Sequence, residues 1–303
     1  MSWVALSVEC ACVDEMTNAV SVISHGPILL RGEECGHMNL QYNIYPCTIG
    51  TAGASIAENL ARQYMPKANF NEKSETMTIT QIGTLQSVQV GTPHRYSIAN
   101  AVDTTKRSWK TSFFRTPGVQ SRWLYTTHLE GNTQADTKNH GQLSQAVLLY
   151  AAAHYPLWQA EPGLPEIGPG GFGENFTVDG LTEEKACIGD IYAIGEAQIQ
   201  VTGPRYPCWK IERRWGIEGL TARVAETGRT GWYCRAVREG MVEPRMFVTL
   251  IERPYPEWTV ALTNDFGHSR NKDVERAEAL AACPLLHEFW QQLVVRCAIR
   301  KKK

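Results

Sequence analysis

The sequence lacks any long hydrophobic run. No apolar stretch approaches the ~18 residues that a transmembrane helix requires. The first residues, MSWVALSVECACVDEM, include a short apolar stretch, but no basic region precedes it and Glu9 interrupts it, so they do not resemble a secretory signal. We therefore expect a cytoplasmic protein that does not interact with membranes.

An excess of charge of either sign is also missing. The chain has 30 Lys and Arg residues against 31 Asp and Glu residues, which gives a net charge of −1. A protein that binds nucleic acid polymers through a basic face would carry a clear positive excess. We therefore expect no nucleic acid polymer among the partners, and we find no internal repeat or low-complexity segment.

The nine cysteines lack the spacings of known metal and redox motifs. None forms a C-x-x-C pair, and none combines with histidines at zinc-binding intervals. The odd number and scattered positions are typical of reduced thiols that pack as small hydrophobic side chains. Cys187 and Cys234, which fall in or beside predicted strands, are expected in the core.

The composition and hydrophobic patterning of the sequence change twice along its 303 residues, which predicts three parts. Residues 1–76 show no lasting hydrophobic period, apart from a plausible helix at 54–63, and this N-terminal segment is expected to be poorly ordered. Residues 77–253 are predicted to form one domain and residues 254–303 a second, small domain.

The middle part is rich in short alternating segments separated by glycine turns. The clearest, AQIQVTG, places Ala197, Ile199 and Val201 on one face of a strand. Other strands are predicted within 78–91, 119–131, 176–180, 190–195, 231–240 and 246–254. Residues 144–158 are predicted to form a helix that Ser144 caps. This pattern favours a closed or nearly closed β-barrel, so the fold class is mainly β with α.

The C-terminal part is predicted to contain three helices, within 258–268, 273–283 and 284–300. Asp273 is a suitable cap for the second helix, and Pro284 suits the first turn of the third. An apolar stripe on the last helix should face the core and comprises Leu286, Phe289 or Trp290, Leu293 and Cys297.

One cysteine stands in an unusual setting, GPRYPCWKIERR. Cys208 follows two prolines, which fix the shape of the turn, and basic residues such as Arg205 and Lys210 surround it. Nearby cations favour the thiolate, which is both a nucleophile and a ligand for soft metals. The residues alone leave two interpretations open: a functional thiol, or a structural thiol beside a solvated basic face.

Three motifs in order resemble the MOSC domain, named for the C-terminal domain of molybdenum cofactor sulfurase. They are GFGENFTVDGLTE, CIGDIYAIGEAQIQVTGPRYPCWKI and TGRTGWYCRAVREG, and the resemblance extends over roughly Met77 to Lys303. The chain is most similar to the YiiM subgroup, in which a MOSC β-barrel precedes a small three-helix domain. The resemblance implies a molybdenum–pterin cofactor and reduction of N-hydroxylated compounds, including N-hydroxylated nucleobases such as 6-hydroxylaminopurine.

The resemblance also implies a set of site residues. Cys208 would be the catalytic residue and the protein ligand of molybdenum. The residues that would bind the cofactor are Arg205, Thr111, Arg115, His140, Gly141, Gly173, Glu174 and Asn175.

The chain departs from the family at its H-G-G-P-D-K-A signature. Gln142, Leu143, Ser144 and Gln145 replace the expected Gly, Pro, Asp and Lys, and an expected G-D pair is Gly131-Asn132. An acid and a base are therefore replaced by neutral residues. Without the family, Glu174 would be interpreted as a solvated loop acid and Asn175 as a turn residue.

Three hypotheses for function follow. The first is a molybdenum-dependent reductase. For Trp209, Trp215 and Trp232 two interpretations stay open, either lining a pocket for a flat purine or packing in the core or at the barrel end. We find neither a predicted nucleotide-binding fold nor a cysteine cluster for iron–sulfur, so a separate electron donor, such as a flavoprotein reductase, would be the partner. The second is a sulfur carrier with a Cys208 persulfide. The third is a barrel that binds an anionic ligand without turnover.

Overall fold

The computed structural model describes residues 80–97, 108–136, 141–161, 164 and 167–299, together with the backbone of four short strands before them. The chain divides into two compact units, Met1–Glu75 and Thr76–Lys303. In the first unit, β1 (Trp3–Leu6) pairs with β4 (Ile28–Arg31), and β2 (Cys10–Val13) pairs with β3 (Val20–Ile23), both antiparallel. The helix predicted at 54–63 lies outside the described residues.

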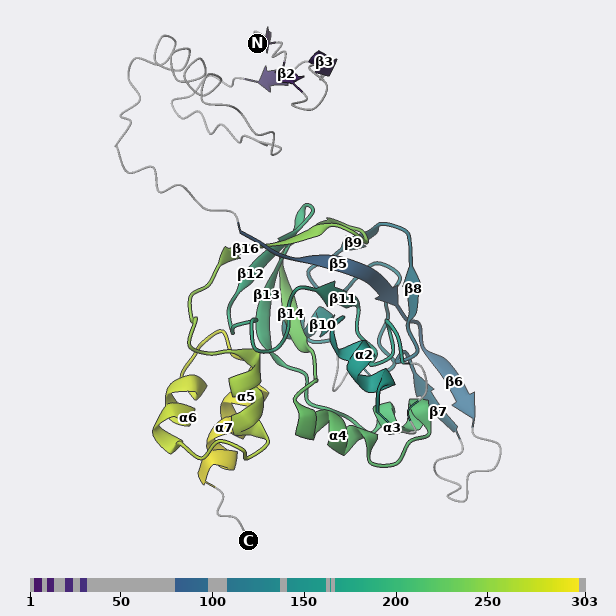
Figure 1. Cartoon of the computed structure of the whole chain (residues 1–303), viewed down its shortest axis with the longest axis vertical. Helices are drawn as coiled ribbons and strands as arrows, with labels where there is room; N and C mark the ends of the chain where they lie inside the picture. The colour runs from purple at the N-terminus through teal and green to yellow at the C-terminus, as the bar shows by residue number, and fades with distance from the viewer. Residues whose placement is uncertain are drawn as a thin grey trace. The chain divides into compact units, whose positions relative to one another are not determined.

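Seven strands of the second unit close into a barrel (Figure 1), as predicted from the short alternating segments. Each strand pairs with the next around the barrel, and the last pairs with the first. Their order is β5 (Thr80–Val90), β11 (Phe176–Asp179), β10 (Val147–Ala151), β14 (Trp232–Arg238), β13 (Ala197–Pro204), β12 (Ile191–Ile194) and β16 (Phe247–Glu252). Only the β10–β11 pair is parallel.

Three smaller strand pairings accompany the barrel. β8 (Thr116–Gly118) continues the sheet beyond β5, and β9 (Arg122–Leu124) pairs with β15 (Gly240–Val242). β6 (His94–Ser97) and β7 (Ser108–Thr111) form a separate hairpin.

The predicted helix at 144–158 is wrong in its first half. Residues Leu143–Gln145 form a short 3-10 turn, η2, and Val147–Ala151 form strand β10, in which every side chain is buried. Only the end of the segment is helical, as α2 (His154–Gln159). A strand that is covered on both faces has a continuous apolar run, which periodicity cannot distinguish from a buried helix.

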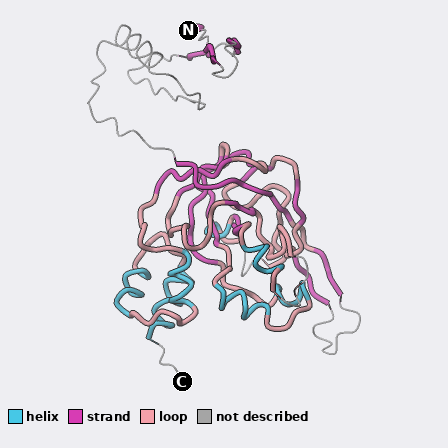
Figure 2. The backbone as a smooth tube through the Cα atoms, viewed as in Figure 1, coloured by secondary structure: helices cyan, strands magenta, loops and turns pink. Residues whose placement is uncertain are grey.

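Two helices follow the Cys208 turn, α3 (Lys210–Trp215) and α4 (Leu220–Thr227). The basic KIERR segment is typical of a solvated face, and its sequence pattern predicts neither helix. Ile211 is in fact fully buried, and it packs with Leu220 and Trp158 in a second hydrophobic cluster under α2. These three helices lie on one side of the barrel (Figure 2).

The three predicted C-terminal helices are present as α5 (Val260–Gly267), α6 (Val274–Ala281) and α7 (Glu288–Ile299). The Asp273 carboxylate caps α6 by accepting a hydrogen bond from the backbone N–H of Arg276 at 3.0 Å. Pro284 does not begin the third helix, because α7 starts at Glu288 and the His287 ring accepts the Phe289 N–H there.

One hydrophobic core joins the barrel to these helices. Ala197, Ile199 and Val201 point into it, as predicted, and Leu286, Trp290, Leu293 and Cys297 of the α7 region are buried against the same cluster. Phe289 is exposed, so the stripe includes Trp290 instead. Cys187 and Cys234 are buried as expected, and burial raises the pKa of both thiols. Among the described residues, no helix combines the length and apolar character that a bilayer crossing demands.

Candidate functional site

Cys208 lies in the turn that connects β13 to α3. β13 ends at Pro204, and the Arg205 backbone N–H donates to the Gly231 carbonyl at 2.9 Å, which fixes the start of the turn. The Cys208 carbonyl accepts hydrogen bonds from the Ile211 N–H at 3.1 Å and from the Thr221 hydroxyl at 3.2 Å. The thiol is half-buried, and its sulfur lies 3.8 Å from the Arg205 guanidinium.

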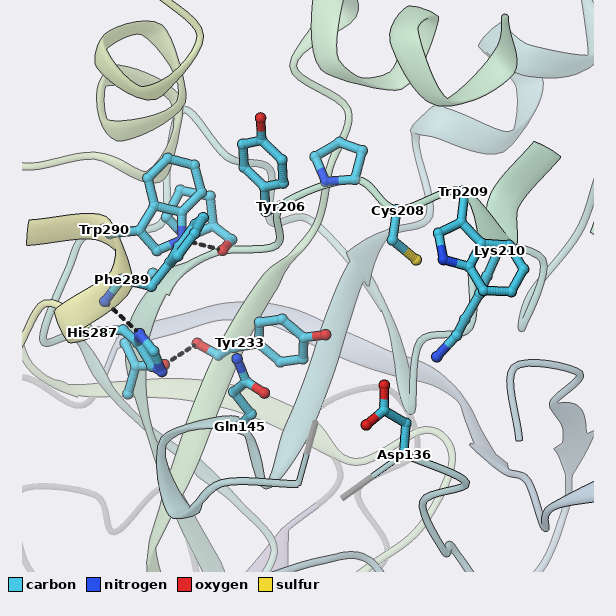
Figure 3. A pocket seen from close by; sticks show the side chains of 14 residues that line it. Asp136, Gln145, Tyr206, Cys208, Trp209, Lys210, Tyr233, His287, Phe289 and Trp290 are labelled. Carbon is cyan, nitrogen blue, oxygen red and sulfur yellow. Dashed lines mark hydrogen bonds between the residues drawn. The ribbon is translucent and has the colours of Figure 1, made fainter. Parts of the chain in front are cut away.

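Two adjoining cavities meet at Cys208. We call the first the aromatic cavity; its volume is about 380 Å³, and its aromatic lining residues are Tyr206, Trp209, Tyr233, His287, Phe289 and Trp290. We call the second the arginine cavity; its volume is about 50 Å³, and Arg115, Arg205 and Thr111 line it. Both cavities are lined by Asp136, Gln145, Tyr206, Cys208, Lys210 and Tyr233. Figure 3 shows the Cys208 sulfur pointing into the space between these side chains.

Two buried arginines give the arginine cavity its positive charge. Arg115 is 8% exposed and Arg205 is 3% exposed, yet Arg115 Nε and Nη1 and Arg205 Nη1 have no hydrogen-bond partner among the residues that the structure describes. Burial lowers the pKa of Arg115 to about 10, and the nearby positive charges of Arg205 and Arg214 act in the same direction. A buried charge without partners is costly unless a ligand supplies them. The cavity is therefore suited to an anion.

Arg214 adds a third guanidinium beside these two. It donates to the carbonyls of Gly170 at 2.6 Å and Phe113 at 3.1 Å, and it lies over the Phe114 and Trp215 rings. Burial lowers its pKa as well. Arg214 therefore holds the loop around the arginine cavity and keeps its hydrogen bonds within the protein.

The G-E-N loop forms another wall of the arginine cavity, but its acid turns away from the cavity. Glu174 is fully buried, and its carboxylate accepts hydrogen bonds from the Tyr155 hydroxyl, the Thr177 hydroxyl and two backbone N–H groups of the same loop, those of Gly170 and Phe172. The interpretation of Glu174 as a solvated loop acid is wrong. Glu174 instead shapes the loop, so the loop's backbone, rather than this carboxylate, borders the site.

Gly173 and Asn175 line the arginine cavity on either side of Glu174. Gly173 has a φ of 74°, and a Cβ there would lie 2.7 Å from the Phe113 ring, so only glycine fits. The Asn175 side chain links two strands, because its Oδ1 accepts from the Leu148 N–H and its Nδ2 donates to the Gln89 carbonyl. Asn175 is thus more than a turn residue.

The structure brings seven of the nine predicted site residues to the arginine cavity: Thr111, Arg115, Gly141, Gly173, Asn175, Arg205 and Cys208. Glu174 lies behind the cavity wall, and His140 falls outside the described residues. Thr111 is buried, and its hydroxyl accepts a hydrogen bond from the Phe113 N–H at 3.0 Å.

The residues that depart from the family signature have defined positions. Gln142 Oε1 lies 2.9 Å from Nε2 of His287, which connects this segment to the start of α7. The Ser144 carbonyl accepts a hydrogen bond from the Thr202 hydroxyl at 2.7 Å, and Gln145 reaches both cavities. Leu143 is exposed. Asn132 accepts a hydrogen bond from the Gly91 N–H, so it has a structural role in place of the expected Asp.

The aromatic side chains of the site are mostly not those suggested by the sequence. Trp232 is fully buried in the barrel core, and Trp215 packs under the G-E-N loop and donates to the Gly171 carbonyl at 2.9 Å. Trp209 does line the aromatic cavity and is 52% exposed. Tyr233 could have been found from strand alternation, because it lies between Trp232 and Cys234, which both point into the core.

His287, Phe289 and Trp290 were also missed as lining residues of the aromatic cavity. They come from the start of α7, far from Cys208 in the sequence, and no local pattern places them there. Among the described residues, no group of three or more His, Cys, Asp or Glu side chains could hold a metal ion. At the site itself, Cys208 is the thiol that lines both cavities.

Comparison with known proteins agrees with this arrangement. The family model described as "MOSC domain" matches residues 136–245. The chain is 36% identical over 194 residues to "Uncharacterized protein YflK" of Bacillus subtilis, which covers 64% of this chain and 85% of that protein. It is 38% identical over 130 residues to "Protein YiiM" of Escherichia coli, covering 41% of this chain and 57% of that protein.

A protein named "Reductase" from Gibberella moniliformis is 35% identical over 156 residues, which cover 50% of this chain and 28% of that protein. Among solved structures, YiiM from Geobacillus stearothermophilus has a TM-score of 0.58 at 26% identity and covers 71% of this chain and 99% of its own. YiiM from Escherichia coli has a TM-score of 0.53 at 27% identity, covering 61% and 88%.

Proposed function

The chain belongs to the MOSC domain family as a YiiM-like member, and from that premise we propose that it is a molybdenum-cofactor-dependent reductase of N-hydroxylated compounds. The substrates would include N-hydroxylated nucleobases such as 6-hydroxylaminopurine. The observation that carries the proposal is the pair of buried arginines with unpartnered N–H groups beside a half-buried thiol.

The residues of the arginine cavity fit an anionic molybdenum–pterin cofactor. The free N–H groups of Arg115 and Arg205 can donate to its phosphate, and guanidinium groups bind phosphate with two hydrogen bonds at once. Cys208 offers the soft sulfur that molybdenum binds, with a positive charge beside it. When bound, the cofactor supplies the two-electron redox chemistry that cleavage of an N–O bond requires.

The protein's own contribution is to hold a flat substrate next to that centre. Tyr206, Phe289 and Trp290 give the aromatic cavity ring surfaces on which a planar base can stack. Because this cavity adjoins the arginine cavity at Cys208, a substrate stacked there would lie close to the Cys208 sulfur (Figure 3). Exclusion of bulk water by these rings would strengthen the electrostatic interactions inside.

We further propose that the electrons come from a separate protein. The described residues hold no cluster of His, Cys, Asp or Glu that could bind a redox metal independently of a cofactor. A flavoprotein reductase is the proposed partner, because flavins accept two electrons at once and pass them on singly or in pairs.

The test is a comparison of the wild-type chain with Cys208→Ser, both produced in cells that make the molybdenum cofactor. We expect the wild type to carry molybdenum and pterin in amounts close to one per chain, and to reduce 6-hydroxylaminopurine with an artificial electron donor. The Cys208→Ser variant should fall to the uncatalysed rate. Cys187→Ala is the matched control, because this buried thiol lines neither cavity.

Other outcomes would favour other functions. Equal rates for wild type and Cys208→Ser would contradict the proposal. A persulfide on Cys208 in a metal-free protein would favour the sulfur carrier. Retention of an anionic ligand with no turnover would favour a binding barrel.

A further inference from the structure

Tyr233 has an uncommitted hydroxyl group in the site. The three tyrosines that are buried elsewhere in the described part of the chain all have hydroxyls engaged in hydrogen bonds: Tyr150 donates to the Arg229 carbonyl, Tyr155 to Glu174 and Tyr192 to Asp190. The Tyr233 hydroxyl makes no hydrogen bond to another described residue, although its ring lines both cavities. Its phenol is therefore a free donor that faces the site (Figure 3).

Gln145 has an uncommitted acceptor in the same place. Its amide oxygen is buried and has no hydrogen-bond partner in the described part of the chain. The residue lines both cavities and ends the η2 turn, whose backbone is fixed by the bond from the Thr202 hydroxyl to the Ser144 carbonyl. An unpaired buried acceptor destabilises a protein unless a ligand provides a donor.

These two groups lie next to each other because of strand pairing. Leu148 of β10 is opposite Tyr233 of β14, and η2 leads directly into β10 and packs against β14. Figure 3 shows the Gln145 amide beside the Tyr233 ring, between Cys208 and the aromatic side chains of α7. The site therefore presents one donor and one acceptor together at the edge of a space bordered by rings.

We propose that Gln145 and Tyr233 recognise an amidine-type edge of the substrate, in which a ring nitrogen lies beside an exocyclic N–H. The ring nitrogen accepts the Tyr233 hydroxyl hydrogen, and the exocyclic N–H donates to the Gln145 oxygen. This inference rests on the proposed function and identifies the two side chains that read one edge of its flat substrate. Simple alkyl hydroxylamines and N-oxides lack one or both groups and are poor substrates.

The recognition also explains how the substrate is oriented. Stacking on Tyr206 or Trp290 fixes the plane of the ring but leaves it free to turn within that plane. Two hydrogen bonds to one edge remove this freedom and hold the hydroxylated nitrogen beside Cys208. A site built to pair with substrate N–H groups rejects analogues that lack them, because its own polar groups are then left unpaired.

The test is a binding cycle with ligands that lack the N–OH group, so it needs no turnover. The ligands are 4-aminoquinazoline, which has the full edge, quinazoline, which lacks the amino donor, and 1-aminonaphthalene, which lacks the ring acceptor. Dissociation constants are measured by calorimetry on the full chain with its bound cofactor. For the wild type, we expect loss of either group to weaken binding about tenfold, the usual effect of one buried hydrogen bond.

Each variant should lose the wild type's preference for one polar group of the ligand and keep its preference for the other. Gln145→Met should bind quinazoline and 4-aminoquinazoline with equal affinity. It should still bind 4-aminoquinazoline more tightly than 1-aminonaphthalene, which lacks the ring nitrogen. Tyr233→Phe should bind 1-aminonaphthalene and 4-aminoquinazoline with equal affinity. It should still bind 4-aminoquinazoline more tightly than quinazoline, which lacks the amino group. Gln145→Glu retains an acceptor and should keep the amino preference, which covers the case in which Gln145→Met does not fold. Tyr125→Phe, at the exposed residue that follows β9 and lines neither cavity, is the control and should match the wild type.

The proposal is overturned if both variants keep both discriminations, or if the wild type shows none. It is equally overturned if a variant loses molybdenum or pterin while ligand discrimination is unchanged, since the side chain then serves the cofactor. Failure of the proposed function would be visible separately, as a wild-type chain without molybdenum or without Cys208-dependent reduction.

Discussion

At the scale of single residues, one arginine pairs with a buried carboxylate, and another is itself a buried charge. Arg253 donates to both carboxylate oxygens of Asp190, at 2.8 and 2.7 Å, and this pair joins β16 to β12. Arg115 is buried, and two of its nitrogens have no partner within the described ranges of the chain. One guanidinium therefore stabilises the barrel, whereas the other is positioned for a ligand at a cost to the empty protein.

The first prediction concerns this contrast in the cofactor-free chain. Arg115→Met should leave its free energy of unfolding unchanged or increase it, because the variant removes an unsatisfied buried charge. Arg253→Met should lower the free energy of unfolding by about 3 kcal/mol, because Asp190 then remains buried without its cation. Urea unfolding of both variants measures the two effects.

The same two variants should have the reverse effect on cofactor content. Arg115→Met should lose pterin and molybdenum, whereas Arg253→Met should retain them when folded. A large destabilisation by Arg115→Met, with cofactor content preserved, would mean that Arg115 has a structural role.

At the scale of elements, α5 ends at a histidine that connects the helices to the site. His268 is the C-terminal cap of α5, and its ring stacks on Tyr206 with centroids 5.3 Å apart. Burial lowers its pKa from 6.5 to about 4, and the neighbouring charge of Arg270 contributes. The folded protein therefore keeps this ring neutral at neutral pH.

The pH dependence of stability follows from that lowered pKa. Between pH 6.5 and about 4, the unfolded chain binds a proton at His268 that the folded chain does not bind. Stability due to this residue is therefore fully present above pH 6.5 and decreases as the pH falls toward 4. Urea midpoints at pH 7.5, 6 and 5 should fall with pH, and less steeply for His268→Gln than for the wild type.

His287 also has a pKa lowered by burial, so His268→Gln should reduce the slope without abolishing it. His287→Gln provides the second variant, and the double variant should show the smallest slope of all. Identical slopes for wild type and His268→Gln would contradict the assignment.

At the scale of the whole molecule, the C-terminal helices share their core with the barrel. The Trp290 indole donates to the Pro204 carbonyl at 2.7 Å, and the His287 N–H donates to the Thr202 carbonyl at 2.8 Å. A β-bridge joins Cys187 to Thr259. The aromatic cavity is completed only by this contact, because its walls come from both parts.

The barrel and the three helices of Thr76–Lys303 should therefore unfold together. Tryptophan fluorescence and far-UV circular dichroism of a 76–303 chain should show the same urea midpoint, as expected for one cooperative unit. Two separate transitions would instead support residues 254–303 as an independent domain, as the sequence predicts.

Much of the fold could be predicted from local patterns. The alternation of apolar and polar residues in 197–203 predicts which face of β13 points into the core. Helix-capping residues and an apolar stripe predict the three C-terminal helices. The failures share one cause: β10 and α3 take their structure from what covers them. A buried strand loses its alternation, and a basic segment such as KIERR becomes a helix face when Ile211 has a core to enter.

The sequence by itself determined the barrel, the family and the stiff turn that presents Cys208, because each depends on short-range pattern or on motifs in order. Only the tertiary structure decided that Glu174 supports a loop, that Arg115 and Arg205 have free N–H groups, and that Tyr233 and Gln145 meet near the start of α7. Pairing, burial and the absence of a partner are relations between distant residues, and they exist only once the chain has folded.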